Sequence, residues 1–176
     1  MTQAVERFVI RAGHEWAFIY VDEAHGVFTS YGSFGNYNYS WGSIGDRTLK
    51  QFLAGLNFDY FMGKTRRDYL RFDAEASVKG IKEHILEARR VGDISKDEAR
   101  QAWREADDLE HHQSADSFYS YLCQSEEIMD LYGGDYCDIA RERPDGDSRG
   151  FWQKIWPEFL KQASALTGNQ ETDGAA

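Results

Sequence analysis

The sequence predicts an α+β fold, with an antiparallel sheet at its N-terminal end and helices after it. The first third is rich in β-branched and aromatic residues, whereas apolar residues recur at helical spacing in most of the remaining chain. Strand-like and helix-like segments stand in separate blocks instead of alternating, which is typical of α+β proteins. A chain of 176 residues, 41% of them hydrophobic, can bury a core.

Four strands are expected before residue 42. The run WAFIYVDE alternates, so that Trp16, Phe18 and Tyr20 share one face and the apolar residues between them share the other. Gly13 and Gly26 stand between apolar runs, where a tight turn can use their freedom to take positive φ. The pattern predicts an antiparallel meander with strands at residues 5–12, 16–23, 26–31 and 37–41.

Two helices are expected in the middle of the chain. Asp46 is placed to cap a helix over residues 47–56, which carries apolar residues at helical spacing. Residues 57–73 are compatible with a short helix, a loop or a strand. Asp73 is placed to cap a longer helix that ends at Gly92.

Two further helices are expected in the acidic part of the chain. Ser95 and Glu98 have the spacing of a capping box, which predicts the start of a helix. Either Ser114 or Asp116 opens the next helix, which the glycine pair at residues 133–134 ends.

The last part of the chain predicts a turn-rich loop at residues 143–150 and then a final helix. Pro157 lies inside the helical pattern, so it marks either the start of that helix or a kink. We expect residues 1–72 to form a sheet with a short helix and residues 73–168 to form an acidic helical region packed on it as one domain. Residues 169–176 are expected to be a disordered tail.

The sequence predicts a soluble, cytoplasmic protein. It shows no apolar segment of the roughly 20 residues that a membrane span needs and no secretory signal. Cys123 and Cys137 have no metal-ligand spacing and are expected to be reduced thiols.

The charge is unevenly placed along the chain. The net charge is −10, yet residues 1–72 carry eight Lys and Arg against seven Asp and Glu. Residues 73–176 carry twelve Lys and Arg against twenty-three Asp and Glu. Within them, residues 105–140 hold ten acidic residues and no Lys or Arg. Such a field repels nucleic-acid phosphates, so we expect no direct binding of nucleic acid and instead a basic protein partner.

The alternating aromatics of NYNYSWG allow two interpretations. Tyr37, Tyr39 and Trp41 project from one face of a strand and could stack on nucleobases, as in sheet-based RNA-binding modules. Aromatics at period two more often pack under helices, and we prefer that interpretation. A sheet-based nucleic-acid-binding module remains an alternative function.

A family resemblance lies in the same region. SFGNYNYSWGSIG followed by LKQFLAGLNFDYFMGK combines a strand that ends in Trp-Gly, a Leu-Phe-Leu helix and a Tyr before a Lys. Over residues 16–64 this pattern resembles small accessory proteins of phages and prophages. The resemblance implies a mobile-element gene, of the kind that encodes anti-CRISPR or other anti-defence inhibitors, and it implies no catalytic residue.

A metal site on the acidic helices is a further alternative. Glu105, Asp108 and His112 share one face of the expected helix, and Asp116 could complete a set of ligands. The protein would then be a small metal-dependent hydrolase that uses helix carboxylates with His111 or His112. The segment contains no HExxH or ExxH motif, so we prefer a solvated acidic face with no metal, cofactor or catalytic residue.

The preferred hypothesis is a non-enzymatic phage protein that inhibits a host nucleic-acid-handling defence complex in the bacterial cytoplasm. Its acidic helices would imitate a nucleic-acid backbone, with exposed tyrosines as anchors. The expected partner-binding residues are Glu105, Asp107, Asp108, Glu110, Asp116, Tyr119, Tyr121, Glu126, Glu127, Asp130 and Tyr132.

Overall fold

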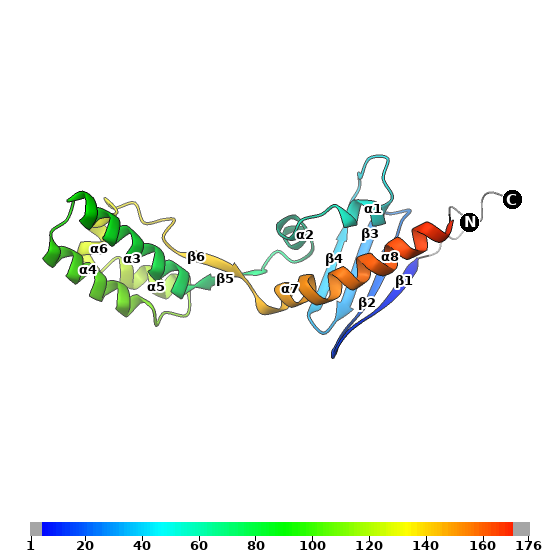
Figure 1. Ribbon diagram of the computed structural model, residues 1–176, viewed down its shortest axis with the longest axis horizontal. Helices are drawn as coiled ribbons and strands as arrows, with labels where there is room; N and C mark the ends of the chain where they lie inside the picture. Colours follow the sequence, from blue (N-terminus) through cyan, green and yellow to red (C-terminus); the bar gives the residue numbers. More distant parts are fainter. Residues whose placement is uncertain (1–4, 171–176) are drawn as a thin grey trace. The chain divides into compact units, whose positions relative to one another are not determined.

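The computed structural model describes residues 5–170, and its contacts divide the chain into two compact units. We call Met1–Tyr69 with Pro144–Ala176 the sheet unit, and Leu70–Arg143 the helical unit. The division differs from the expected one, because the last helix belongs with the sheet and not with the acidic helices. The α+β prediction itself is confirmed: an antiparallel sheet comes first and helices fill the C-terminal half (Figure 1).

The sheet is the predicted meander. Its strands lie in the order β1-β2-β3-β4, and each pairs antiparallel with the next. Gly26, at the turn before β3, has a φ of 64°, and a Cβ there would lie 2.2 Å from the backbone oxygen of Trp41, so only glycine fits. The strands span Glu6–Ala12 (β1), Glu15–Asp22 (β2), Val27–Gly32 (β3) and Gly35–Ser40 (β4).

Two short helices follow the sheet. Helix α1 (Leu49–Ala54) is capped by Thr48, whose side chain forms a capping box with Gln51. Asp46, the predicted cap, lies two residues too early. Helix α2 (Phe58–Thr65) occupies much of residues 57–73, for which the sequence allows a helix, a loop or a strand.

The C-terminal helix begins earlier than predicted. Asp145 caps α7 (Gly146–Gly150), which continues through a π-helical turn, η1 (Phe151–Ile155), into α8 (Trp156–Gln170). Residues 143–150, expected in a turn-rich loop, therefore form the end of a strand and a helical turn. Pro157 stands at the second position of α8, directly after the wide turn, which agrees with a start or kink at this proline. Of the predicted tail, residues 169–170 belong to α8 and residues 171–176 lie outside the described part.

The helices of the sheet unit pack on one face of the sheet. Figure 1 shows α8 lying along that face, where the ring centroids of Phe8 and Phe159 are 5.1 Å apart. The ring of Tyr37 stacks on Phe151 at 4.1 Å, and Trp41 is buried with it. The packing interpretation of the aromatic strand is confirmed, and the alternative in which Tyr37 and Trp41 stack on nucleobases is wrong. Burial raises the pKa of Tyr37 above its ordinary value.

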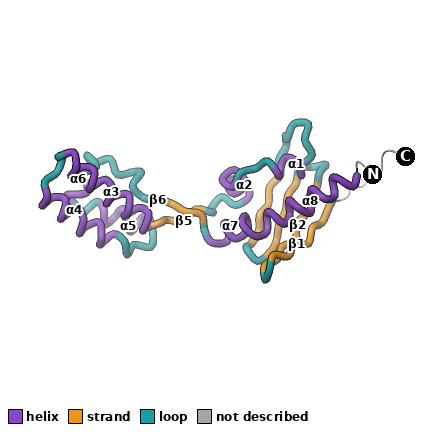
Figure 2. Tube along the Cα trace, in the orientation of Figure 1, coloured by secondary structure: helices purple, strands orange, loops and turns teal. Residues whose placement is uncertain are grey.

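The helical unit has its own core. Strand β5 (Leu70–Asp73) opens it and pairs with β6 (Arg141–Pro144), and the helices lie between them in sequence (Figure 2). These are α3 (Ala74–Val91), α4 (Lys96–Leu109), α5 (Ala115–Leu122) and α6 (Glu126–Leu131). The core side chains are Val78, Ile81, Ile85, Ala102, Ala106, Leu109, Phe118, Leu122, Ile128 and Ile139.

Most of the predicted helix ends in this unit are confirmed. Asp73 caps α3 and Gly92 ends it in the left-handed region. Ser95 forms the expected capping box, and Ser114 is the cap of α5. The single helix expected from residue 114 to the glycine pair is instead two helices, separated at residues 123–125.

Candidate functional site

The acidic residues are concentrated in the helical unit. Residues 70–143 carry ten Lys and Arg against eighteen Asp and Glu, so this unit holds most of the net charge of −10. The run without Lys or Arg covers the end of α4, all of α5 and α6, and the segment that leads to β6. These elements are therefore the candidate interaction site.

Six of the eight predicted carboxylates are exposed. Five of these six form no ion pair with any residue in the described range 5–170, so their charge is available to a partner. They are Asp108, Glu110, Asp116, Glu126 and Asp130.

Asp107 differs from its neighbours because it has a local partner. Its Oδ1 lies 2.5 Å from Nζ of Lys82 on α3, and that ammonium also lies 5.3 Å from the ring centroid of Trp103. The ion pair joins α3 to α4. Asp107 therefore does not belong to the freely available charges.

Glu105 and Glu127 interact across the contact between α4 and α6. Glu105 is half-buried, its Oε1 accepts a hydrogen bond from Nε2 of Gln101 at 3.1 Å, and its Oε2 is buried. Burial, followed by the neighbouring carboxyl of Glu127, raises the pKa of Glu105 above its ordinary value of 4.5. These two residues couple to each other and are less suited to contact a partner than the exposed five.

The three predicted tyrosine anchors occupy different environments. Tyr121 is 47% exposed and packs beside His112, with ring centroids 5.0 Å apart. Tyr119 is half-buried: its hydroxyl donates to the carbonyl of Cys137 at 2.6 Å and accepts from the backbone N–H of Ala140 at 3.2 Å. Tyr119 therefore ties α5 to the segment before β6, and only Tyr121 has the exposure that an anchor needs.

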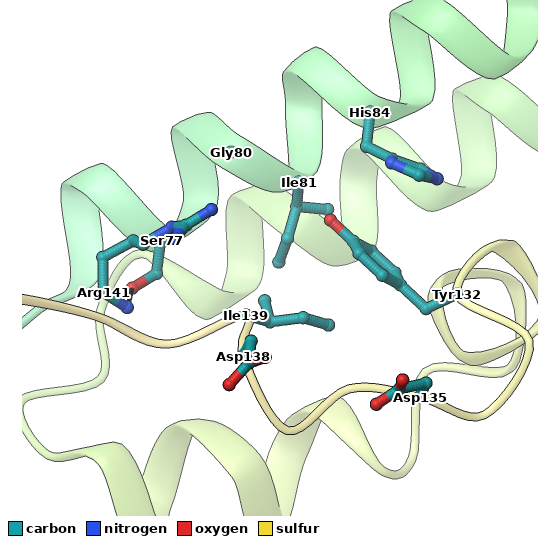
Figure 3. Close-up of a pocket in the computed structure, with 9 residues that line it drawn as sticks. All are labelled: Ser77, Gly80, Ile81, His84, Tyr132, Asp135, Asp138, Ile139 and Arg141. Carbon is teal, nitrogen blue, oxygen red and sulfur yellow. Dashed lines mark hydrogen bonds between the residues drawn. The ribbon is translucent and has the colours of Figure 1, made fainter.

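Tyr132, the third tyrosine, lines a pocket of about 280 Å³ between α3 and the segment before β6 (Figure 3). Its ring stacks on His84 at 4.6 Å, and burial raises its pKa. Asp135 and Asp138 reach the pocket from the segment after α6, and the guanidinium of Arg141 lies at its other end. The pocket therefore offers both signs of charge, unlike the exposed acidic residues.

The floor and one wall of this pocket are built from buried residues. Ile81 and Ile139 form an apolar floor. Ser77 is fully buried; its hydroxyl donates to the carbonyl of Asp73 at 2.6 Å and accepts from the backbone N–H of Arg141 at 2.7 Å. These bonds hold β6 against the start of α3 and fix the position of the pocket. No sequence pattern predicts this site, because its residues are far apart along the chain.

The proposed metal ligands do not converge. Across residues 5–170, no group of three or more His, Cys, Asp or Glu could hold a metal ion, so Asp108 and His112 lack a third ligand. Cys123 and Cys137 are exposed free thiols. Within the same range, no helix is both long enough and apolar enough to cross a membrane.

Comparison with known proteins gives a match to a family model. The model is described as a phage family and matches residues 2–165, which is nearly the whole chain. No curated protein and no solved structure matches the chain significantly.

Proposed function

The chain belongs to a phage protein family, and we propose that it binds and inhibits a nucleic-acid-handling defence complex of the bacterial host, of the anti-CRISPR or anti-restriction kind. The helical unit binds the basic surface of that complex in the bacterial cytoplasm. The proposal assigns no catalytic residue and no cofactor.

The observation that carries the proposal is the set of exposed carboxylates without ion-pair partners on α4, α5 and α6. On a helix surface, oppositely charged side chains three or four residues apart stabilise each other. Residues 105–140 contain no Lys or Arg. Among the described residues, Arg104 stands four residues before Asp108 on α4 but forms no ion pair with it, whereas Asp107 obtains a partner from α3. Like charges kept this close repel one another, and a basic partner relieves that repulsion.

A nucleic-acid-binding protein presents the complementary surface. Its Lys and Arg side chains are arranged to contact the phosphates of the nucleic acid. In double-stranded DNA there is one phosphate for about every 1.7 Å of helix axis, counting both strands. Carboxylates such as Asp108 and Glu126 accept the same charge-assisted hydrogen bonds from Arg and Lys. The helical unit would therefore occupy the nucleic-acid site, and the exposed ring of Tyr121 would add an aromatic contact.

The test is affinity capture from a bacterial lysate with the full chain as bait, analysed by mass spectrometry at low and high salt. The variant carries Asp108→Lys, Glu110→Lys, Glu126→Lys and Asp130→Lys. The control makes the same change in net charge at exposed positions of the same unit outside the acidic run: Glu75→Lys, Glu83→Lys, Glu87→Lys and Asp97→Lys. Circular dichroism checks that both variants are folded.

We expect the wild-type chain and the control to capture the same nucleic-acid-binding protein, and the variant to lose it. Wild-type capture should weaken at least tenfold between about 50 and 200 mM salt, because electrostatic attraction dominates the encounter. Equal capture by the variant and the wild type, with the same dependence on salt, would contradict the proposal.

A further inference from the structure

One face of the sheet in the sheet unit is not covered by any described helix of that unit. The core lies on the other face, where Ala17, Ile19 and Val21 are buried. The residues that alternate with them point away from the helices, and large side chains among them are exposed. Tyr31 is 57% exposed and Tyr20 is 37% exposed. We call this surface the outer face.

The strand register arranges the outer face in rows. In one row, Arg7 lies opposite Tyr20, and Tyr20 lies opposite Thr29. In the next row, Phe18 lies opposite Tyr31. The outer face therefore has an aromatic strip on β2 and β3, with an arginine beside it on β1.

The two edges of the strip are mostly polar, although the exposed Val9 lies opposite Phe18 between the two arginines of β1. Arg11 lies opposite Trp16 and provides a second guanidinium on β1. On β4, Asn36 lies opposite Tyr31 and Asn38 lies opposite Thr29. Arginines border the strip on one side and amides border it on the other.

The aromatic side chains of the strip pack against one another and not into the core. The ring of Trp16 makes edge contacts with Phe18 and Tyr31, with centroids 5.3 and 5.5 Å apart. None of these three belongs to the hydrophobic cluster under the helices. Tyr31 is exposed, and Trp16 and Phe18 are half-buried. A contiguous aromatic surface of this kind marks a binding site more often than a single exposed residue does.

The local charge of the outer face is positive. Arg7 and Arg11 are exposed and form no ion pair with any residue of the described chain. Asp22 is the one carboxylate at an outward position of β1–β4 as described, and it is hydrogen-bonded to His25 at 2.8 Å at the end of β2. Glu6 pairs instead with a lysine of α1, on the helix side.

The overall charge of −10 does not decide what this face binds. Most of it belongs to the helical unit, and exposed charges are screened beyond about 8–10 Å at physiological salt. The expectation that the protein has no direct nucleic-acid partner rests on the charge of the whole chain. Whether the outer face can bind nucleic acid depends on the charge next to the aromatic strip.

We infer that the outer face binds single-stranded nucleic acid. Aromatic side chains stack on bases whatever their sequence, while arginines neutralise phosphates and amides bind base edges and sugars. Residues two apart on a strand, such as Phe18 and Tyr20, are about 6.8 Å apart, twice the 3.4 Å rise per nucleotide of one strand. A single strand that is unstacked and stretched to about twice that rise can place successive bases on successive rings, whereas a stacked strand would place every second base there.

Fluorescence anisotropy of the full chain with labelled oligouridine and oligothymidine tests this inference. Stacking does not depend on the sugar, so both oligomers are expected to bind and a DNA duplex is expected to bind at least tenfold more weakly. The double variant Tyr20→Ala, Tyr31→Ala should weaken binding by about tenfold or more. Tyr60→Ala is its control, because Tyr60 is 41% exposed and lies on α2, not on the outer face.

The arginines have a separate readout. Arg7→Gln with Arg11→Gln should lower the slope of log affinity against log salt by about 1.4, since each phosphate contact on a single strand contributes about 0.7. Arg149→Gln, an exposed arginine on α7, should leave the slope unchanged. Equal melting temperatures show that the variants are folded.

Three results would overturn the inference. The first is no binding of either oligomer at concentrations up to about 1 mM, which is weaker than non-specific nucleic-acid binding. The second is binding that the tyrosine variant does not weaken relative to Tyr60→Ala. The third is a wild-type dimer that dissociates in the tyrosine variant while no oligomer binds, since the occupant of the outer face would then be a second copy.

Discussion

At the scale of single residues, the pair of Glu105 and Glu127 makes stability depend on pH. Burial and the neighbouring carboxyl raise the pKa of Glu105 above 4.5, so the folded state binds its proton more tightly than the unfolded state does. The contribution of this group to stability is present below pH 4.5 and is lost as the pH rises through its folded pKa. Glu105→Gln should therefore stabilise the protein at pH 7 by a few tenths of a kcal/mol, the size of a like-charge repulsion on helices.

Urea unfolding at several pH values between 4 and 7 measures this effect. The gain of Glu105→Gln over the wild type should shrink towards pH 4, because a larger fraction of Glu105 is protonated there. Asp108→Asn is the matched control, because Asp108 lies on the same helix and is exposed. A gain for Glu105→Gln that is equal at pH 4 and pH 7 would show that charge is not its cause.

The sequence predicted the acidic run at this scale but not the partners of its members. Asp107 meets Lys82, and Glu105 meets Glu127, across more than twenty residues of chain. Spacing along a helix shows only which residues share a face of that helix. Whether a carboxylate remains available to a partner protein is therefore decided by how α3, α4 and α6 pack, which the sequence does not show.

At the scale of elements, the helix caps differ in what they contribute. The hydroxyl of Ser95 accepts a hydrogen bond from the N–H of Glu98 at 3.2 Å, and the Glu98 carboxylate accepts one from the N–H of Ser95 at 2.6 Å. Ser125 stands at the same position before α6 but makes no such bond. Ser95→Ala should lower the free energy of unfolding by about 1 kcal/mol, and Ser125→Ala by less than about 0.5 kcal/mol.

Chemical denaturation of the two variants, monitored by helical circular dichroism, tests this difference. Both substitutions remove the same atom from an N-cap serine, so the comparison isolates the capping bond. Equal losses, or a larger loss for Ser125→Ala, would contradict the assignment of a working cap to Ser95.

Element boundaries were predictable where their cause is local. The capping box of Ser95 and the left-handed Gly92 are encoded within a few neighbouring residues, and both predictions are confirmed. The face of the sheet that is covered was not predictable, because Trp16, Phe18 and Tyr20 are as apolar as the residues between them. Coverage depends on helix α8, which lies more than a hundred residues away.

At the scale of the molecule, charge and aromatic surface are divided between the two units. The helical unit holds most of the negative charge, and the outer face of the sheet unit carries exposed rings beside two arginines. The counts for residues 1–72 and 73–176 already indicated an uneven charge. They could not show that residues 144–176 belong with the sheet, because that division depends on contacts such as Phe8 with Phe159.

The division into two units predicts that residues 70–143 fold on their own. The described side chains of the core of the helical unit all come from within this range, and strands β5 and β6 pair at its two ends. A single core of this size supplies about 3–5 kcal/mol, which is enough for one cooperative unfolding transition. The fragment 1–143 should behave differently, because it lacks α8 and the aromatic core around Phe8 and Phe28 is left open. Only the helical part of this fragment should unfold cooperatively.

Thermal unfolding of both fragments, with near-ultraviolet circular dichroism to report fixed aromatic packing, makes the comparison. A 70–143 fragment without a cooperative transition, or a 1–143 fragment with native packing of its sheet aromatics, would show that the two units do not fold as separate bodies.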